Sequence, residues 1–137
     1  MKKLMFLIMF IIGSTIFASY TENLTERMSL VEEKIQKVYD KPNVTDAEMT
    51  KACELGRKAW DNELNTVYQL LMKKLSKEYQ ELLRKEERQW IKDRDKAAKE
   101  AGDEFKGGTL EPLIITSTLL EETKARTIQL AEMYDSF

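Results

Sequence analysis

The sequence predicts an all-α protein, an up-and-down antiparallel bundle of three to four helices that follows a cleaved signal peptide. Apolar residues recur every three or four positions along most of the chain, and turn-forming residues interrupt that spacing at a few points. No stretch alternates between apolar and polar residues for the length of a strand. Amphipathic helices joined by short turns can bury their apolar stripes only against one another, which favours a bundle.

The start of the chain has the composition of a signal peptide, which we assign to residues 1–18. Lys2 and Lys3 form a positively charged start. The apolar run that follows is about half of the roughly 20 residues that a membrane-spanning helix needs. We expect cleavage after Ala18 or Ser19, a periplasmic or secreted mature protein, and no stable membrane insertion after cleavage.

Residues 19–44 are predicted to form an N-terminal helical segment, and residues 45–137 are predicted to form the main helical domain. The length of the mature chain favours a single core. The turn at residues 40–43 contains Pro42 and ends the first helix. The apolar stripe before that turn consists of Leu24, Met28, Val31, Ile35 and Val38.

The second helix carries the longest apolar stripe in the chain. Thr45 and Glu48 form a capping-box pattern, in which each side chain accepts a hydrogen bond from a free amide of the first turn. The stripe that follows keeps helical spacing for about seven turns. It consists of Met49, Cys53, Gly56, Trp60, Leu64, Val67, Leu71 and Leu75.

Two further helices complete the predicted bundle. Ser76 is the expected N-cap of the third helix, and the sequence leaves open whether residues 73–77 form a tight corner or continue the second helix. Glycines bracket a loop at about residues 102–109, and Thr109 is the expected N-cap of the last helix. The expected stripes are Tyr79, Leu82, Leu83, Trp90 and Ala97 in the third helix, and Leu113, Thr116, Leu120, Thr123, Thr127, Leu130 and Tyr134 in the fourth.

The composition argues against several classes of function. Loss of the signal peptide removes Lys2 and Lys3 from the 22 basic side chains and leaves 20 against 24 acidic ones, a net charge of −4. This charge disfavours nucleic acid and favours a basic partner. The chain contains no histidine, the commonest metal ligand and the commonest general base at neutral pH. We therefore predict no catalytic residue, no metal site and no cofactor.

Several charged residues lie on or beside the predicted stripes of the last two helices. Glu86 and Asp93 stand two helical turns apart, a spacing at which they could imitate the acid and base of a glycosidase. A buried network of arginine and carboxylates that fixes helix register explains the same residues without catalysis, and we adopt this interpretation. Its expected members are Glu86, Asp93, Arg94, Asp95, Thr123 and Arg126.

Cys53, Trp60 and Trp90 are interpreted as core residues. Cys53 is the only cysteine, so it cannot form an internal disulfide, and there is no histidine to activate it as a nucleophile. An intermolecular disulfide after export is the alternative for this thiol. Both tryptophans lie on the predicted stripes, which favours packing over a role as ligand platforms.

Phe105 and Lys106 lie at the tip of the glycine-bracketed loop and are the candidate contacts with a protein partner. The loop has neither the spacing of a phosphate-binding loop nor a strand before it. A solvated connector without a binding role is the alternative interpretation.

Three patterns in the main domain occur together in a known order. They are Leu-Asn-x-x-Tyr from Leu64, Gln-Trp-x-x-x-Arg-Asp from Gln89, and a closing Thr-x-x-Arg from Thr123. In this order and spacing, residues 53–126 resemble the N-terminal domain of LprI-type lysozyme inhibitors, a family of exported bacterial helical domains. The residues that carry the resemblance are Cys53, Trp60, Asp61, Asn62, Glu63, Leu64, Asn65, Tyr68, Leu71, Leu75, Gln89, Trp90, Ile91, Arg94, Asp95, Gly107, Gly108, Thr109, Thr123 and Arg126.

The resemblance implies a helical domain that binds and inhibits lysozyme and so protects peptidoglycan. Many members carry further cysteines, but this sequence has Ala97, Ala98 and Thr118 in those regions, so the resemblance implies that the family's disulfides are absent. The cysteine that anchors the namesake lipoprotein to lipid is also missing. We therefore expect an exported, non-catalytic binding protein whose partner is lysozyme. A structural or adaptor module of the envelope is the main alternative, and a hydrolase based on Glu86 and Asp93 is a further one.

Overall fold

The computed structural model of the protein describes residues 17–137, which form four α-helices and contain no strand. The helices are α1 (Tyr20–Tyr39), α2 (Asp46–Lys74), α3 (Lys77–Asp103) and α4 (Leu110–Asp135). The prediction of an all-α bundle is therefore confirmed. Most of the expected signal peptide falls at residues 1–16, outside the described residues. Within the described part, no helix is both long enough and apolar enough to cross a membrane.

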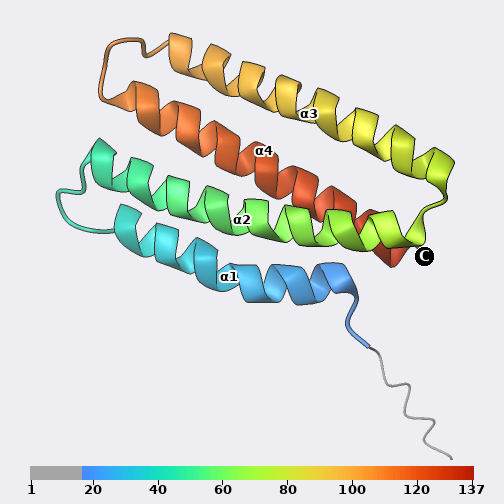
Figure 1. The fold of residues 1–137 in the computed structure, drawn as a ribbon. Helices are drawn as coiled ribbons and strands as arrows, with labels where there is room; N and C mark the ends of the chain where they lie inside the picture. Colours follow the sequence, from blue (N-terminus) through green and yellow to red (C-terminus); the bar gives the residue numbers. More distant parts are fainter. Residues whose placement is uncertain (1–16) are drawn as a thin grey trace, which may run out of the picture.

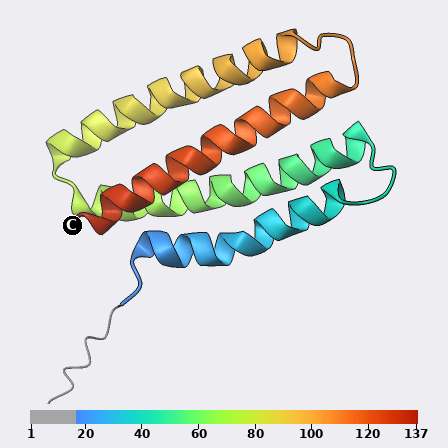
Figure 2. The same ribbon diagram turned by 180° about the vertical axis from the view of Figure 1, so that it is seen from behind.

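Helices that follow one another in sequence run antiparallel, but their order in space differs from their order in the chain. Figure 1 and Figure 2 show the spatial order α1, α2, α4, α3, so that α2 and α4 run parallel at the centre. The α2–α4 interface is the most extensive one, α1 packs against both central helices, and α3 packs chiefly against α4. The side of α3 that faces α2 is therefore left partly open.

Helix α2 supplies most of the core, and its sequence explains why. Thr45 and Glu48 form the predicted capping box: the Glu48 amide donates to Thr45 Oγ1 at 3.2 Å, and the Thr45 amide donates to Glu48 Oε2 at 2.9 Å. The predicted stripe is confirmed as the buried face of the helix. Its buried members are Cys53, Gly56, Trp60, Leu64, Val67 and Leu71.

The connection between α2 and α3 is a tight corner, which answers the question that the sequence leaves open. Leu75 has an extended backbone, and the Ser76 hydroxyl accepts a hydrogen bond from the Tyr79 amide. The Gln80 side chain then closes the end of α2, because its Nε2 donates to the carbonyl oxygens of Met72 at 2.7 Å and Leu75 at 3.2 Å.

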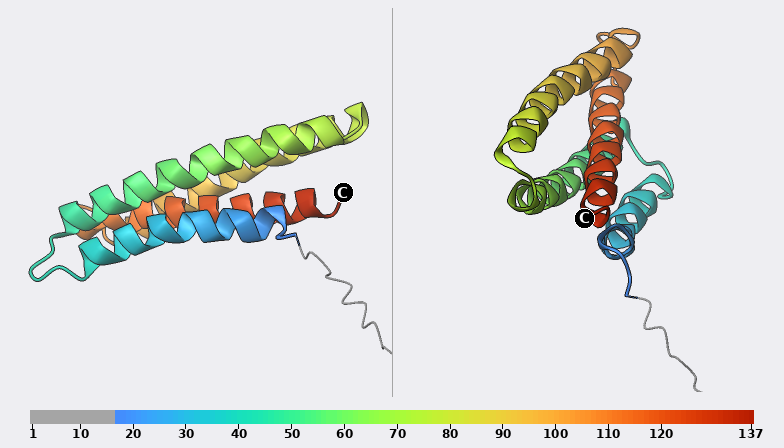
Figure 3. Two further views of the ribbon diagram at one scale, coloured as in Figure 1. Left: turned by 90° about the horizontal axis from the view of Figure 1, so that it is seen from below. Right: turned by 90° about the vertical axis from the view of Figure 1, so that its right-hand side faces the viewer.

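The buried face of α3 differs from the predicted stripe. Tyr79 and Leu82 are 59% and 55% exposed, so their assignment to the core was wrong, whereas Leu83 is buried as expected. Figure 3 shows the reason: α3 leaves the corner at an angle to α2 and does not lie along it. The buried residues of α3 are Leu83, Glu87, Ala98 and Gly102.

Helix α4 buries most of its predicted stripe, and Thr109 is its N-cap residue as predicted, but without a capping hydrogen bond. Thr109 has a helical backbone and makes no side-chain capping bond; its hydroxyl instead donates to Asp46 Oδ2 at 2.6 Å and joins the starts of α2 and α4. The buried members of the stripe are Leu113, Leu120, Thr123, Thr127 and Leu130, while Thr116 and Tyr134 are half-buried.

The start of α1 is attached to the end of α4. Asp135 accepts hydrogen bonds from the amides of Tyr20 at 2.7 Å and Thr21 at 3.0 Å, and from the Thr21 hydroxyl at 2.6 Å. Ser19 and Glu22 form a capping box on the same turn. Burial raises the pKa of Asp135, but the bonds from Thr21 and Tyr20 outweigh it and hold this pKa below its usual value.

Candidate functional site

Most of the residues that carry the family resemblance occupy three places in the structure, while Gln89 and Asp95 are exposed on α3 and do not line the groove. One group lies in the core between α2 and α4, a second lines a groove between α2 and α3, and the glycine pair lies in the loop before α4.

Cys53 and Trp60 are core residues, as predicted. Each is only 1% exposed, and the Cys53 thiol is hydrogen-bonded to the Tyr39 hydroxyl at 2.8 Å. Burial raises the pKa of the thiol, so it is protonated and unreactive at neutral pH. The Trp60 indole donates to Glu32 Oε1 at 2.9 Å, which satisfies its polar atom.

Thr123 and Thr127 replace the larger apolar side chains that would fill this part of the α4 stripe. Both are fully buried. The Thr127 hydroxyl donates to the Thr123 carbonyl oxygen at 2.7 Å and approaches the Trp60 carbonyl oxygen at 3.3 Å. The α2 and α4 backbones are thereby linked at the centre of the core.

The predicted arginine–carboxylate network lies on the inner side of the groove between α2 and α3. Arg126 is 5% exposed; its Nε donates to Glu87 Oε1 at 2.6 Å and its Nη2 donates to Glu86 Oε1 at 2.8 Å. Burial raises the pKa of Glu87, and the hydrogen bond from Arg126 acts in the opposite direction. Arg126 is buried and binds Glu86, but Glu86 is 56% exposed, and Glu87, which was missed from the sequence, is the buried carboxylate of the network.

Four expected members lie outside this network: Asp93, Arg94, Asp95 and Thr123, whose hydroxyl has no hydrogen-bond partner among the described residues. Asp93 is exposed and accepts a hydrogen bond from Gln89 Nε2 at 2.9 Å, so its assignment to the network was wrong. Arg94 pairs with Asp95 at 2.8 Å, and its guanidinium lies 5.1 Å from the centre of the Trp90 ring. These are local contacts along α3 and contribute little to helix register.

The α2–α3 groove has a volume of about 390 Å³ and collects residues from two separate patterns of the sequence. The side that belongs to α2 presents Asp61, Leu64, Asn65 and Tyr68, and the side that belongs to α3 presents Arg84, Glu87, Arg88, Trp90, Ile91 and Arg94. Leu64 and Glu87 are buried, whereas Asn65, Arg88 and Ile91 are exposed. The Leu-Asn-x-x-Tyr and Gln-Trp-x-x-x-Arg-Asp patterns therefore meet at one surface.

Trp90 belongs partly to the core and partly to the groove. It is half-buried and packs against the core on one side, as predicted, while it also lines the α2–α3 groove. Arg94, stacked on this ring, lines the groove as well, so a positively charged edge and an aromatic surface lie next to each other.

Phe105 and Lys106 lie in the α3–α4 loop, at the opposite end of α3 from the corner (Figure 1). Phe105 is 38% exposed, and Lys106 is exposed. The loop is held by backbone bonds from Phe105 to Gly102 at 2.9 Å and from Gly108 to Phe105 at 3.0 Å. Gly107 has a φ of 83°, which favours glycine, and its amide donates to Glu111 Oε2 at 2.7 Å.

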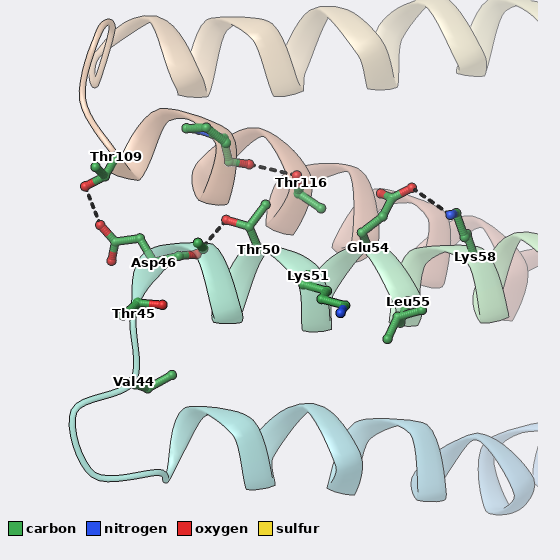
Figure 4. Close-up of a pocket in the computed structure, with 12 residues that line it drawn as sticks. Val44, Thr45, Asp46, Thr50, Lys51, Glu54, Leu55, Lys58, Thr109 and Thr116 are labelled. Carbon is green, nitrogen blue, oxygen red and sulfur yellow. Dashed lines mark hydrogen bonds and ion pairs between the residues drawn. The ribbon is translucent and has the colours of Figure 1, made fainter.

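A larger hollow of about 1020 Å³ lies where α2 and α4 begin (Figure 4). The Asp46–Thr109 hydrogen bond spans it, and Lys58 and Glu54 pair along its α2 side at 3.8 Å. Of the residues that carry the family resemblance, Thr109 alone lines this hollow, whereas seven line the α2–α3 groove. Size alone therefore does not make it the better candidate site.

Three comparisons with known proteins bear on this surface. A family model described as "Lysozyme inhibitor LprI" matches residues 22–130, a range that reaches all four helices. An uncharacterized protein from Rhizobium meliloti (strain 1021) is 30% identical to this chain over 106 residues, which cover 68% of this chain and 76% of the relative. No solved structure is significantly similar to the chain.

Proposed function

Because the chain belongs to the LprI family of lysozyme inhibitors, we propose that it is an exported periplasmic or secreted protein that binds and inhibits lysozyme and so protects peptidoglycan. The observation that carries this proposal is the family match, which covers all four helices and both sides of the α2–α3 groove. The relative from Rhizobium meliloti suggests no activity, since it is itself uncharacterized.

We infer that the protein acts by occlusion, without chemistry of its own. The two carboxylates that could imitate a glycosidase are already engaged: Glu86 with Arg126, and Asp93 with Gln89. A general acid must be free to give its proton to the substrate, whereas both of these carboxylates already accept hydrogen bonds from neighbouring side chains.

The α3–α4 loop is the proposed inhibitory element. Phe105 offers an apolar contact and Lys106 a positive charge, a pair suited to a lysozyme cleft that contains acidic catalytic groups. The hydrogen bonds of Gly107 and Gly108 hold the loop in one conformation before it meets a partner. Such a loop loses little conformational freedom on binding, which favours affinity.

The opposite net charges of this protein and a basic lysozyme would assist their encounter. The mature protein carries a net charge of −4, and animal lysozymes are basic, so the two proteins attract at a distance. This attraction raises the association rate at low ionic strength and is screened at physiological salt. Inhibition that depended on charge alone would therefore disappear at physiological salt.

The test is the activity of a basic lysozyme on bacterial cell walls with increasing amounts of residues 19–137, alongside direct binding by calorimetry, at low and physiological salt. We expect dose-dependent inhibition and saturable binding at both salt concentrations. Absence of binding at both would remove the lysozyme proposal and leave the fold intact.

The loop has its own test with a matched control. Phe105→Ala combined with Lys106→Ala should weaken inhibition at least about tenfold, the loss of a well-placed contact pair. The control combines Leu55→Ala with Lys51→Ala, which removes one exposed apolar and one exposed basic side chain from α2. If the two double variants inhibit equally well, the loop is not the inhibitory element.

The alternative is a non-catalytic envelope adaptor with another protein partner. The α2–α3 groove favours it, because the groove is a second surface, separate from the loop, with a different character. Failure to bind lysozyme, together with specific binding of an envelope protein that is lost in a groove variant, would favour the adaptor.

A further inference from the structure

We propose that the signal peptide is cleaved between Ala18 and Ser19, and that the new positively charged amino terminus of Ser19 pairs with Glu22 and Asp135, so that processing joins α1 to α4. The inference rests on the export proposed above and does not depend on lysozyme. Three observations carry it: the residue at which α1 begins, the hydrogen bond that the Ser19 backbone nitrogen makes, and two carboxylates that meet at this turn.

Helix α1 begins directly after the expected cleavage region. Ser19 is its N-cap, and the Glu22 amide donates to Ser19 Oγ at 3.1 Å. Phe17 and Ala18 precede this cap, and Phe17 is 87% exposed. Figure 1 shows the chain leaving the bundle at this point. A cut after Ala18 therefore keeps the cap, whereas a cut after Ser19 removes the hydroxyl that closes the first turn.

Hydrolysis of the Ala18–Ser19 peptide bond changes the charge at the cap. A signal peptidase adds one water molecule across the bond, so that Ala18 leaves with a carboxylate and the Ser19 nitrogen becomes an α-amino group. An unperturbed α-amino group is largely protonated at neutral pH. A neutral amide is thereby replaced by an ammonium group with three N–H donors.

The Ser19 nitrogen already faces a carboxylate. In the capping box of α1, this nitrogen donates to Glu22 Oε2 at 2.9 Å. Before cleavage the donor is an amide, and after cleavage the same contact joins an ammonium group to a carboxylate. Charge-assisted hydrogen bonds of this kind are roughly twice as strong as neutral ones. The gain requires no rearrangement of α1.

The second carboxylate comes from the end of α4. Asp135 accepts hydrogen bonds from the amides of Tyr20 at 2.7 Å and Thr21 at 3.0 Å. Burial raises the pKa of Asp135, but these bonds and the nearby Ser19 hydroxyl hold it below its usual value. Within residues 17–137, neither Glu22 nor Asp135 forms an ion pair. A positive charge at Ser19 supplies the partner that both lack.

These two carboxylates decide whether the new charge stabilises α1. The start of a helix carries a partial positive charge, so an ammonium group alone is unfavourable there. With Glu22 and Asp135 on the same turn, attraction outweighs this repulsion. Because Asp135 belongs to α4, the pairing also strengthens the attachment of α1 to α4. The processed chain is therefore more stable than the same chain with an uncharged nitrogen at position 19.

The cleavage site is tested with the full precursor, produced in a bacterium that exports it. The intact mass of the exported protein should correspond to residues 19–137. A mature chain that begins at Tyr20 or at any other residue would overturn the inference and leave the export intact. A chain that keeps its signal peptide would contradict both the export and the inference.

The pairing is tested by urea unfolding of residues 19–137 with a free Ser19 amine, and of the same protein acetylated on that amine by an N-terminal acetyltransferase. Acetylation keeps one N–H donor and removes the charge. At neutral pH and low salt, the free amine should lower the equilibrium constant for unfolding about two- to fivefold relative to the acetylated form. High salt should reduce this difference, because it screens the pairing.

Two sets of substitutions separate charge from structure. Glu22→Gln combined with Asp135→Asn removes both negative charges and keeps oxygen atoms that can accept the same hydrogen bonds. In this variant the acetylated form should be the more stable one, because only the repulsion from the helix start remains. Glu26→Gln is the matched control, since Glu26 is an exposed carboxylate one turn further along α1. With this substitution the free amine should keep its full advantage.

Two unfolding results would overturn the pairing. The acetylated form could be at least as stable as the free amine in the unchanged protein, or the free amine could keep its advantage after both carboxylates are replaced. Neither result bears on lysozyme inhibition, because lysozyme is absent from these measurements.

Discussion

The α2–α4 and α3–α4 interfaces share a helix but differ in composition. The face of α2 toward the core is apolar and includes large side chains such as Trp60 and Leu71. The buried face of α3 includes one large apolar residue, Leu83, together with Glu87 and two small residues. The first interface is a hydrophobic core, whereas the second is a narrow contact with a charged pair at its centre.

This difference explains how the molecule can be stable and still present an open groove. Burial of apolar side chains stabilises the α2–α4 pair, and such an apolar interface tolerates small shifts in the register of the two helices. The buried pair of Arg126 and Glu87 adds little net stability, but a charge left alone there is costly, so α3 is held in one register. Helix α3 can therefore stand away from α2 and keep the groove between them.

The largest expected effect comes from the apolar interface. Trp60→Ala should destabilise the protein by about 3–5 kcal/mol, because it removes a fully buried indole and leaves a cavity between α2 and α4. The measurement is urea unfolding monitored by circular dichroism. A loss below about 1 kcal/mol would show that the α2–α4 pair is not the stabilising centre.

The next effect tests the polar interface. Arg126→Met should cost about 3 kcal/mol, because Glu87 is then buried without a partner. The double variant Arg126→Met with Glu87→Leu should recover most of that loss, which a double-mutant cycle measures. Equal losses in the single and double variants would show that the arginine matters for packing and not for its charge.

Replacing Gly102 of α3 tests how closely α3 and α4 must approach each other near the loop that connects them. A Cβ atom on Gly102 would clash with Ile115 Cγ1, so Gly102→Ala should cost about 1–3 kcal/mol despite alanine's better helix propensity. Ile115→Ala removes the obstructing atoms. In a protein that already carries this substitution, the additional cost of Gly102→Ala should fall to near zero. An unchanged unfolding midpoint for Gly102→Ala alone would mean that the two helices are not in close contact there.

The smallest effect concerns the attachment of α1. Asp135→Asn should cost about 1 kcal/mol at neutral pH, the usual magnitude for a capping carboxylate. The pKa of Asp135 is lower in the folded protein, so its contribution is complete above the usual carboxyl pKa of 3.8 and is lost as the pH falls through the lowered value. Unfolding of both proteins from pH 7 to pH 2 should show the difference shrinking in acid. A difference that grows in acid would contradict this assignment.

Most of the fold could be predicted from sequence because its signals are local. The capping box at Thr45 and the long stripe of α2 depend on residues within one or two turns of each other. The errors concern contacts between distant segments. Tyr79 and Leu82 have helical spacing, but spacing does not tell whether another helix arrives to cover them. Thr109 is a good N-cap by type, yet its hydroxyl binds Asp46, 63 residues away.

The candidate groove could be predicted only in part, for the same reason. Its residues came from patterns on two helices, but their convergence depends on the angle between α2 and α3, which no local pattern encodes. Glu87 was missed because a glutamate in an amphipathic helix is ordinarily solvent-exposed, and only its pairing with Arg126 makes its burial favourable. A search for carboxylates on the inner face of α3 opposite Arg126 could have found it.

The most direct test of the account is a lysozyme assay at physiological salt that compares the mature protein, the Phe105→Ala and Lys106→Ala double variant, and the groove variant Arg88→Glu. We expect dose-dependent inhibition by the mature protein, a loss of at least about tenfold in the loop variant, and unchanged inhibition by Arg88→Glu. This result would place lysozyme at the loop and away from the groove. No inhibition by the mature protein at any dose would contradict the proposed function.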